Sequence, residues 1–199
     1  MPARRAQAGE CRPSGRLGRL PVRPRFPLRI VTLNVNGIRS ADRKGLHPAR
    51  HLRHFSGILQ ADAFAGYNQL YEDGQIVEAA CWSHARRKMW DIHERQHQLP
   101  GTLAHQALER IGEVFKVESE IRGQPPDERQ RVRRQRTGPA LVDLKAWLAS
   151  TLAQLSAKSP MALAIGYSMS NWTALTRFVD DGRIEAHNNA AERALRSVA

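Results

Sequence analysis

The sequence lacks long hydrophobic runs, and it contains only two cysteines, Cys11 and Cys81, among 199 residues. Since no apolar stretch approaches the roughly 20 residues of a membrane-spanning helix, no membrane partner is expected. Residues 1–27 have no continuous apolar core, which argues against a secretory signal. Two cysteines cannot build a disulfide framework, so the expected compartment is the reducing cytoplasm.

Acidic residues are scarce in the first part of the chain, and this shapes the net charge of +12. Residues 1–55 carry a net charge of +11, whereas residues 56–199 carry +1. A basic chain often binds nucleic acid, but the nearly neutral body gives that inference little support. Residues 1–27 are rich in Arg, Pro and Gly and have no hydrophobic period, which predicts a disordered basic tail. Such a tail either stays solvated or contacts DNA phosphates without specificity.

Three short segments predict strands. Residues 30–33 are mostly β-branched, residues 58–61 form a short apolar run, and residues 76–82 are almost continuously apolar. We expect the second and third of these strands to pair with each other. Residues 29–35 are expected to add a further strand.

From Ser83 onward the apolar residues follow helical spacing almost to the end of the chain. The pattern predicts helices at about 83–97, with Ser83 as the cap, at 103–121, from 125 to about 152, and from 159. A last helix is predicted to begin at Asn188-Asn189. The fold class is therefore α/β and mostly helical.

The predicted helix from residue 125 begins with the strongly charged sequence DERQRVRRQR. This composition favours a solvated arm. The alternative is a nucleic-acid-binding site, because the same stretch contains four arginines, Arg131, Arg133, Arg134 and Arg136.

Two carboxylates are candidate metal ligands. Asp62 ends a predicted strand, where a rigid scaffold can hold its oxygens toward a cleft. The alternative is an aspartate that caps the turn after the strand. Glu192 lies near the start of the last predicted helix, on the same face as Asn188 four residues earlier. Its alternative is a capping box with Asn189, and both roles can coexist in different rotamers.

The sequence Cys81-Trp82-Ser83-His84 forms a C-x-x-H step between a predicted strand and a predicted helix. A zinc site would need His93 or His97 as further ligands. His84 and His93 are nine residues apart and fall on opposite faces of a helix, which argues against such a site. His93 and His97 share a face and are expected to be ordinary surface residues.

Several motifs, in order, resemble the catalytic domain of insertion sequence 66 family transposases. They are ILQADAFAGYNQLYEDGQIVEAACWSHARRKMWDIHE, ERIGEVFKVESEIRG, PPDERQRVRRQR and DDGRIEAHNNAAERALR. The match runs from about Asp42 to Ala199 and is specific because the motifs keep their order and spacing. It implies a ribonuclease H-like fold with a helical insertion at about residues 99–180.

The resemblance also implies an Asp-Asp-Glu active site for cutting and joining DNA. Asp62 matches the second catalytic aspartate and Glu192 the catalytic glutamate, while Cys81 and His84 match a supporting C-x-x-H step. Three such carboxylates can hold two Mg²⁺ or Mn²⁺ ions about 4 Å apart and support phosphodiester chemistry. The implied partners are the DNA of transposon ends and a second copy of the chain or a full-length transposase.

This chain departs from the family pattern at three points. Nothing in residues 1–41 supplies the first catalytic aspartate. The sequence His187-Asn188-Asn189 stands where the family usually has Asp-Asn-Asn, and the resemblance makes these three residues further candidate supporting residues. The chain stops within the glutamate's helix. We therefore expect residues 42–199 to be a truncated, incomplete ribonuclease H-like domain that is inactive by itself. The alternatives are a non-catalytic module that binds DNA or a transposase, and a nonfunctional product of a decayed mobile element.

A second resemblance covers residues 28–45, LRIVTLNVNGIRSADRKG, and concerns the exodeoxyribonuclease III type of apurinic endonuclease. Asn34 matches the early active-site asparagine of that family. The family's acidic metal ligands and catalytic histidine do not follow. We therefore interpret residues 28–41 as a foreign strand-like segment joined by gene rearrangement, and we expect no repair nuclease.

Overall fold

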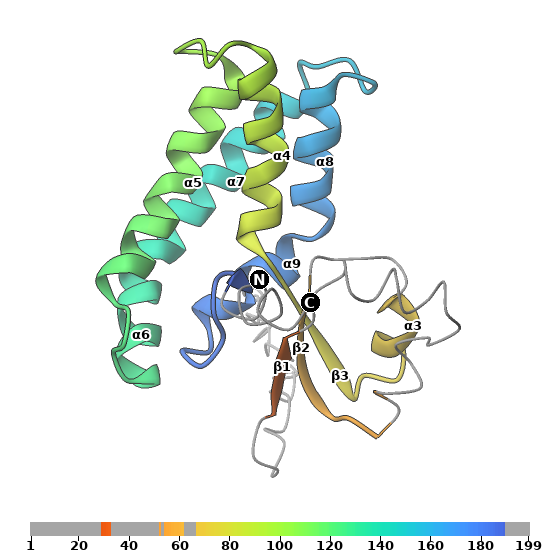
Figure 1. Ribbon diagram of the computed structural model, residues 1–199, viewed down its shortest axis with the longest axis vertical. Coiled ribbons are helices and arrows are strands. Elements are labelled where there is room, and N and C mark those ends of the chain that lie inside the picture. The colour runs from red at the N-terminus through yellow and green to blue at the C-terminus, as the bar shows by residue number, and fades with distance from the viewer. Residues whose placement is uncertain (1–28, 33–51, 53, 62–66, 190–199) are drawn as a thin grey trace, which may run out of the picture.

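The computed structural model describes residues 29–32, 52, 54–61 and 67–189 of the chain. Within them a small parallel sheet lies below a bundle of helices, and α4 continues directly from the last strand into the bundle (Figure 1). The predicted tail at residues 1–27 and nearly all of the predicted last helix fall outside the described residues. No helix in the described part of the chain is long and apolar enough to cross a membrane.

The sheet contains β1 (Ile30–Thr32), β2 (Gly57–Ala61) and β3 (Ile76–Ala80), in that spatial order and all parallel. The register pairs Gly57 of β2 with Ile76 of β3 and Ala61 with Ala80, so the predicted pairing of the second and third strands is confirmed. The short helix α3 (Asn68–Tyr71) lies in the crossover between them, as parallel pairing requires a long connection. β1 pairs with β2, so the further strand expected within residues 29–35 is present at Ile30–Thr32, while residues 33–35 lie outside the described residues.

The central strand β2 is covered on both faces. Successive side chains of a strand point to opposite faces. Ile58 joins the core under the helices, whereas Leu59 and Ala61 join a second cluster with Phe55 and Tyr67. A strand buried on both sides is typical of parallel sheets and explains its nearly continuous apolar sequence.

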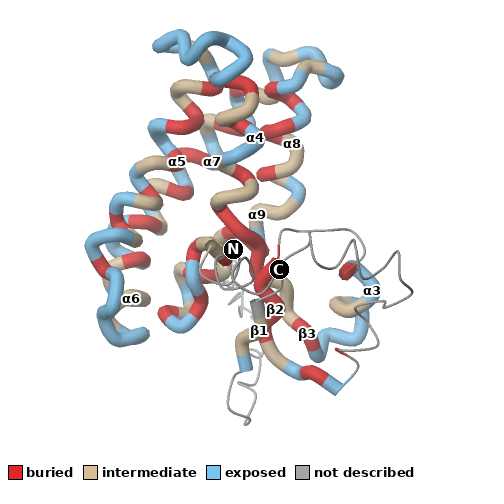
Figure 2. Tube along the Cα trace, in the orientation of Figure 1, coloured by how far each residue is buried: buried red, intermediate tan, exposed pale blue. Residues whose placement is uncertain are grey.

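The bundle consists of α4 (Trp82–Arg95), α5 (Leu103–Glu120), α7 (Gly138–Leu152) and α8 (Pro160–Ser170). α4 and α7 each pack against both α5 and α8, and the buried residues form stripes that face inward (Figure 2). The short elements α9 (Trp172–Thr176) and η3 (Arg177–Val179) follow and lead back toward the sheet.

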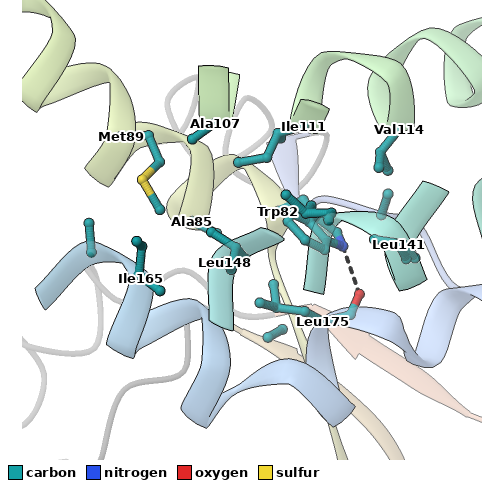
Figure 3. Close-up of a cluster of buried hydrophobic side chains, with 14 of the residues drawn as sticks. Trp82, Ala85, Met89, Ala107, Ile111, Val114, Leu141, Leu148, Ile165 and Leu175 are labelled. Carbon is teal, nitrogen blue, oxygen red and sulfur yellow. Dashed lines mark hydrogen bonds between the residues drawn. The ribbon is translucent and has the colours of Figure 1, made fainter. Parts of the chain in front are cut away.

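The bundle core is built from the apolar stripes that the sequence predicts. On α4 the predicted residues Ala85, Met89 and Ile92 are all buried. Trp82 is fully buried at the centre of this core, and its indole Nε1 donates a hydrogen bond to the carbonyl of Leu175 at 2.8 Å (Figure 3). This bond ties the first residue of α4 to α9.

The start of α4 differs from the prediction. The helix begins at Trp82 with Cys81 as its N-cap, and no side chain caps it. The amide of Trp82 instead donates to the carbonyl of Ala186 at 3.0 Å. A carbonyl from a distant segment therefore satisfies the first amide of the helix. The helix start predicted at residue 159 is confirmed, and Ser159 caps it, since its hydroxyl accepts from the amide of Ala162 at 3.1 Å.

The charged stretch after Pro125 is not a solvated arm. It forms α6 (Pro126–Val132), then the π-helical turn η2 (Arg133–Thr137), and continues as α7. Arg131, Arg134 and Arg136 are exposed as expected. Arg133 is fully buried, because it forms ionic and main-chain contacts that a local charge pattern does not predict.

The carboxyl of Glu78 on β3 is half-buried, and this makes stability depend on pH. Burial raises its pKa above the usual value of 4.5, and the charge of Arg177 offsets part of this rise. The folded state thus favours the protonated acid, so the stability associated with this group is present below pH 4.5 and is lost as the pH rises through the raised pKa. We expect Glu78→Gln to raise the melting temperature at pH 7 more than at pH 4.

Thermal unfolding followed by circular dichroism at the two pH values measures this effect. Glu72→Gln removes an exposed carboxylate at the end of α3 and serves as the control. An equal change at both pH values for Glu78→Gln would contradict the assignment.

Candidate functional site

The two predicted catalytic carboxylates, Asp62 and Glu192, lie outside the described residues. The residues that flank them are described. Ala61 ends β2 and pairs with Ala80, the last residue of β3, and Cys81 follows directly. The carboxyl ends of both strands therefore lie together at one edge of the sheet, where parallel sheets commonly carry their sites.

At this edge the C-x-x-H step meets the segment that leads toward Glu192. The thiol of Cys81 donates to Oδ1 of Asn188 at 3.0 Å, and the amide of Asn188 lies 3.5 Å from the same sulfur. Both residues are buried although 107 positions separate them. The structure thus brings together two of the predicted supporting residues, in a contact that fixes the backbone.

The other predicted supporting residues surround this contact. The ring of His187 stacks on Phe115 of α5, with centroids 5.7 Å apart and planes 12° apart. Nδ1 of His187 accepts from the amide of Asn189 at 3.4 Å. His84 is half-buried in the first turn of α4, and its amide donates to the carbonyl of Cys81. His187 therefore packs the segment that contains Asn188 against α5.

A polar network holds the segment before His187 between the helices and the sheet. Arg129 of α6 makes a bidentate ion pair with Glu185, with both contacts at 2.8 Å. Nε2 of Gln60 on β2 donates to the carbonyl of Glu185 at 2.5 Å. Glu185 is thus tied to α6 through its side chain and to the central strand through its main chain.

The turn before Glu185 carries its own ion pair. Arg183 donates twice to the carboxylate of Asp181, from Nε at 2.9 Å and from Nη2 at 2.7 Å. These hydrogen bonds hold the pKa of Asp181 below its usual value of 3.8. The predicted Asp181-Gly182 turn is therefore rigid and leads directly into the segment with Asn188.

The buried Arg133–Glu118 pair is the part of the site that sequence reasoning missed. Arg133 donates from Nε to Oε1 of Glu118 at 2.8 Å and from Nη2 to Oε2 at 2.6 Å. A signal was present in the sequence. Glu118 stands seven residues after Ile111 and four after Val114, on the apolar stripe of α5. An acid on a buried stripe needs a buried cation.

The zinc hypothesis requires Cys81 and the histidines of α4 to be placed as ligands. The Cys81 thiol instead donates a hydrogen bond to Asn188. His93 is buried, contrary to expectation, because it packs between Trp90 and His105 with ring centroids 5.8 and 5.3 Å away. His97 is exposed, as expected. In the described part of the chain, no group of three or more His, Cys, Asp or Glu side chains is placed to hold a metal ion.

A groove of about 680 Å³ lies next to this edge, between α4 and α5. Asn189 and Ser83 line its end near the sheet. Its walls combine cations with aromatic rings, since Arg86 lies over the ring of Trp90 at 5.7 Å. Two acids also line the groove, so its charge is balanced.

A family model described as Transposase IS66 family matches residues 38–199. The chain belongs to the IS66 transposase family. The resemblance predicted from about Asp42 onward is thereby confirmed, with a start four residues earlier. The comparisons give no support to the exodeoxyribonuclease III resemblance of residues 28–45, and the family match begins inside that segment.

Three proteins of Sinorhizobium fredii are related to the chain. The uncharacterized protein y4hP is 36% identical over 80% of this chain and 31% of its own length. The uncharacterized proteins y4jD and y4qI are 36% and 35% identical, over 83% and 74% of this chain. The chain spans about a third of the length of these relatives. No solved structure matches the chain.

Proposed function

We propose that the chain is the metal-binding part of a DNA transposase of the Asp-Asp-Glu type, built on a ribonuclease H-like fold. In this proposal Asp62 and Glu192 are the retained carboxylates, and residues 99–180 are a helical insertion. The Cys81–Asn188 contact carries the proposal. It joins the end of β3 to the segment that precedes Glu192, and Ala61, which precedes Asp62, is paired beside it.

The donor chemistry fits a hard divalent cation. The sulfur at this edge is engaged with an amide, which leaves the carboxylates of Asp62 and Glu192 as the proposed ligands. Oxygen ligands suit Mg²⁺ or Mn²⁺ better than zinc. A bound ion would offset negative charge on a phosphodiester during cleavage. The proposed partners are transposon-end DNA and a further transposase subunit.

The chain by itself is expected to neither cleave nor join transposon ends. Residues 1–41 contain no aspartate to complete the set, and His187 replaces a further carboxylate near Glu192. An imidazole cannot supply the attraction of a carboxylate for Mg²⁺. A misplacement of only 1 Å at an active site can lower the rate by about 100-fold, and the absence of a whole metal ligand is expected to cost at least as much.

An in vitro assay on transposon-end DNA with Mg²⁺ or Mn²⁺ tests this, with Asp62→Ala as the matched variant. Cleavage by the chain that disappears in Asp62→Ala would show the chain to be active. Titration with Mn²⁺ tests the site separately, since Asp62→Ala should weaken binding by about tenfold or more. Equal binding by both proteins would remove Asp62 from the site.

The groove between α4 and α5 favours one other candidate function, a non-catalytic module that binds DNA. Arginines and aromatic rings line this groove beside Asn189, and side chains of these two kinds bind single nucleic-acid strands in other proteins. DNA binding that weakens with salt and needs no metal ion would support the module. Aggregation of the purified chain would instead favour a decayed, nonfunctional element.

A further inference from the structure

Two charged side chains of the helical part are buried against the segment that leads to Asn188. The side chain of Arg133 has no exposed surface, and that of Glu118 is 8% exposed. Their two hydrogen bonds have the fork-to-fork geometry in which guanidinium and carboxylate fit best. The pair therefore holds the guanidinium in one orientation.

The remaining arm of this guanidinium faces main-chain carbonyls. Nη1 of Arg133 donates to the carbonyls of Phe178 and Ile184, each at 2.9 Å. A longer contact of 3.3 Å reaches the carbonyl of Asp181. The guanidinium also lies over the Phe178 ring at 5.0 Å. One buried group thus fixes both ends of residues 178–184.

Stability by itself does not account for this arrangement. Taking two charges out of water costs several kcal/mol per ion, and an apolar pair of similar volume is often at least as stable. Arg133 also begins the π-helical turn η2, a rare distortion that occurs frequently at functional sites. The feature that an apolar pair would lack is the set of donors to the carbonyls.

We propose that Arg133 and Glu118 form a positioning pair for the candidate site. The pair holds residues 178–184 so that Asn188 reaches Cys81 at the carboxyl end of β3. The inference rests on the proposed function, because it assigns the pair to the placement of Glu192. Neither side chain is a catalytic residue.

Neighbouring contacts act in the same direction. Arg129 holds Glu185, and Gln60 holds the main chain of Glu185 to β2. Nε of Arg177 donates to the carbonyl of Glu78 on β3 at 2.7 Å. The segment from 177 to 188 is therefore fixed to the sheet at two points and to the helices through Arg129 and Arg133. Of these groups, Arg133 is the most deeply buried and binds the most carbonyls.

The reactivity of the Cys81 thiol reports the position of the segment. In a Cys11→Ser background, Cys81 is the one remaining thiol, and it is buried against Asn188. We expect Arg133→Met to raise its rate of reaction with a disulfide reagent by about tenfold or more, through local opening of the segment. Far-UV circular dichroism should retain the helical signal. Arg134→Met, which removes an exposed ion pair with Asp180, should change the rate by less than about twofold.

The double variant Arg133→Met with Glu118→Leu separates positioning from stability. It removes both buried charges, so the melting temperature should recover relative to Arg133→Met. Because it restores no donor to the carbonyls, Cys81 should stay reactive. Return of Cys81 to its protected state in the double variant would overturn the proposal. Should Arg133→Met fail to fold, Arg133→Lys decides the matter: reactive Cys81 supports the pair, and full protection overturns it.

Mn²⁺ titration of the same proteins keeps the two proposals apart. Arg133→Met should weaken Mn²⁺ binding by about tenfold if Glu192 is displaced. A wild-type chain that binds no Mn²⁺ would end the proposed function, and with it the assignment of the pair to Glu192. Weaker Mn²⁺ binding together with reactive Cys81 supports both proposals, and wild-type Mn²⁺ binding that Arg133→Met leaves unchanged overturns the positioning pair.

Discussion

Replacing Trp82 with alanine is expected to lower the free energy of unfolding by about 3–5 kcal/mol. Trp82 is fully buried at the junction of β3, α4 and α9. Alanine would remove most of the ring volume and leave the carbonyl of Leu175 without its indole donor. It would also end the edge-to-face contact with Trp172, whose ring centroid lies 5.8 Å away. Urea unfolding followed by circular dichroism measures the change.

Trp147→Ala is the matched control, because it removes the same side chain from a half-buried position on α7. The guanidinium of Arg110 lies over the Trp147 ring, 4.6 Å from its centroid. The ring is partly buried and packs against the core from outside, whereas Trp82 lies within it. A loss of roughly 1–2 kcal/mol is expected there. If Trp82→Ala cost no more than Trp147→Ala, the central place of Trp82 in the core would be contradicted.

The local sequence was sufficient to predict most of the bundle. On α4 the spacing of Ala85, Met89 and Ile92 predicts one buried face, and all three are buried. The physical reason is that a helix with one apolar stripe has a single favourable orientation on a core. The strands at 58–61 and 76–82 were predicted from their composition and length rather than from helical spacing. They are observed at Gly57–Ala61 and Ile76–Ala80.

The sequence was insufficient where a residue's partner lies far along the chain. Arg133 is in a run of charged residues that looks solvated, yet its partners are Glu118 and the carbonyls of Phe178 and Ile184. The start of α4 at Trp82 depends on the carbonyl of Ala186. Such contacts follow from tertiary packing, which local propensities do not contain.

The candidate site shows the same division. Cys81 and Asn188 were singled out through resemblance to a family, while the hydrogen bond between them became visible in the fold. Asp62 and Glu192 lie outside the described residues, so their role stays a prediction. What the fold adds is the anchored segment from 177 to 188, which has little regular structure and depends on close contacts for its path.

Gly182 lies in this segment and packs directly against the main chain of Pro126. Gly182→Ala is expected to lower the free energy of unfolding by about 3 kcal/mol or more. A methyl group at Gly182 would lie 1.6 Å from the carbonyl oxygen of Pro126 and 2.5 Å from its carbonyl carbon. Both atoms belong to the main chain at the start of α6, so no change of side-chain rotamer can relieve the clash. In the variant, the turn at 181–183 must therefore separate from α6.

Gly166→Ala in α8 is the control, since an added methyl group there meets no atom within 4 Å. Within a helix this change should stabilise the chain by about 0.5–1 kcal/mol. The two variants add the same methyl group and are expected to shift the urea midpoint in opposite directions. Because the turn leads into Asn188, Gly182→Ala should also expose the Cys81 thiol under native conditions, in the Cys11→Ser background. A stable Gly182→Ala protein with a protected thiol would mean that the turn does not need its close approach to α6.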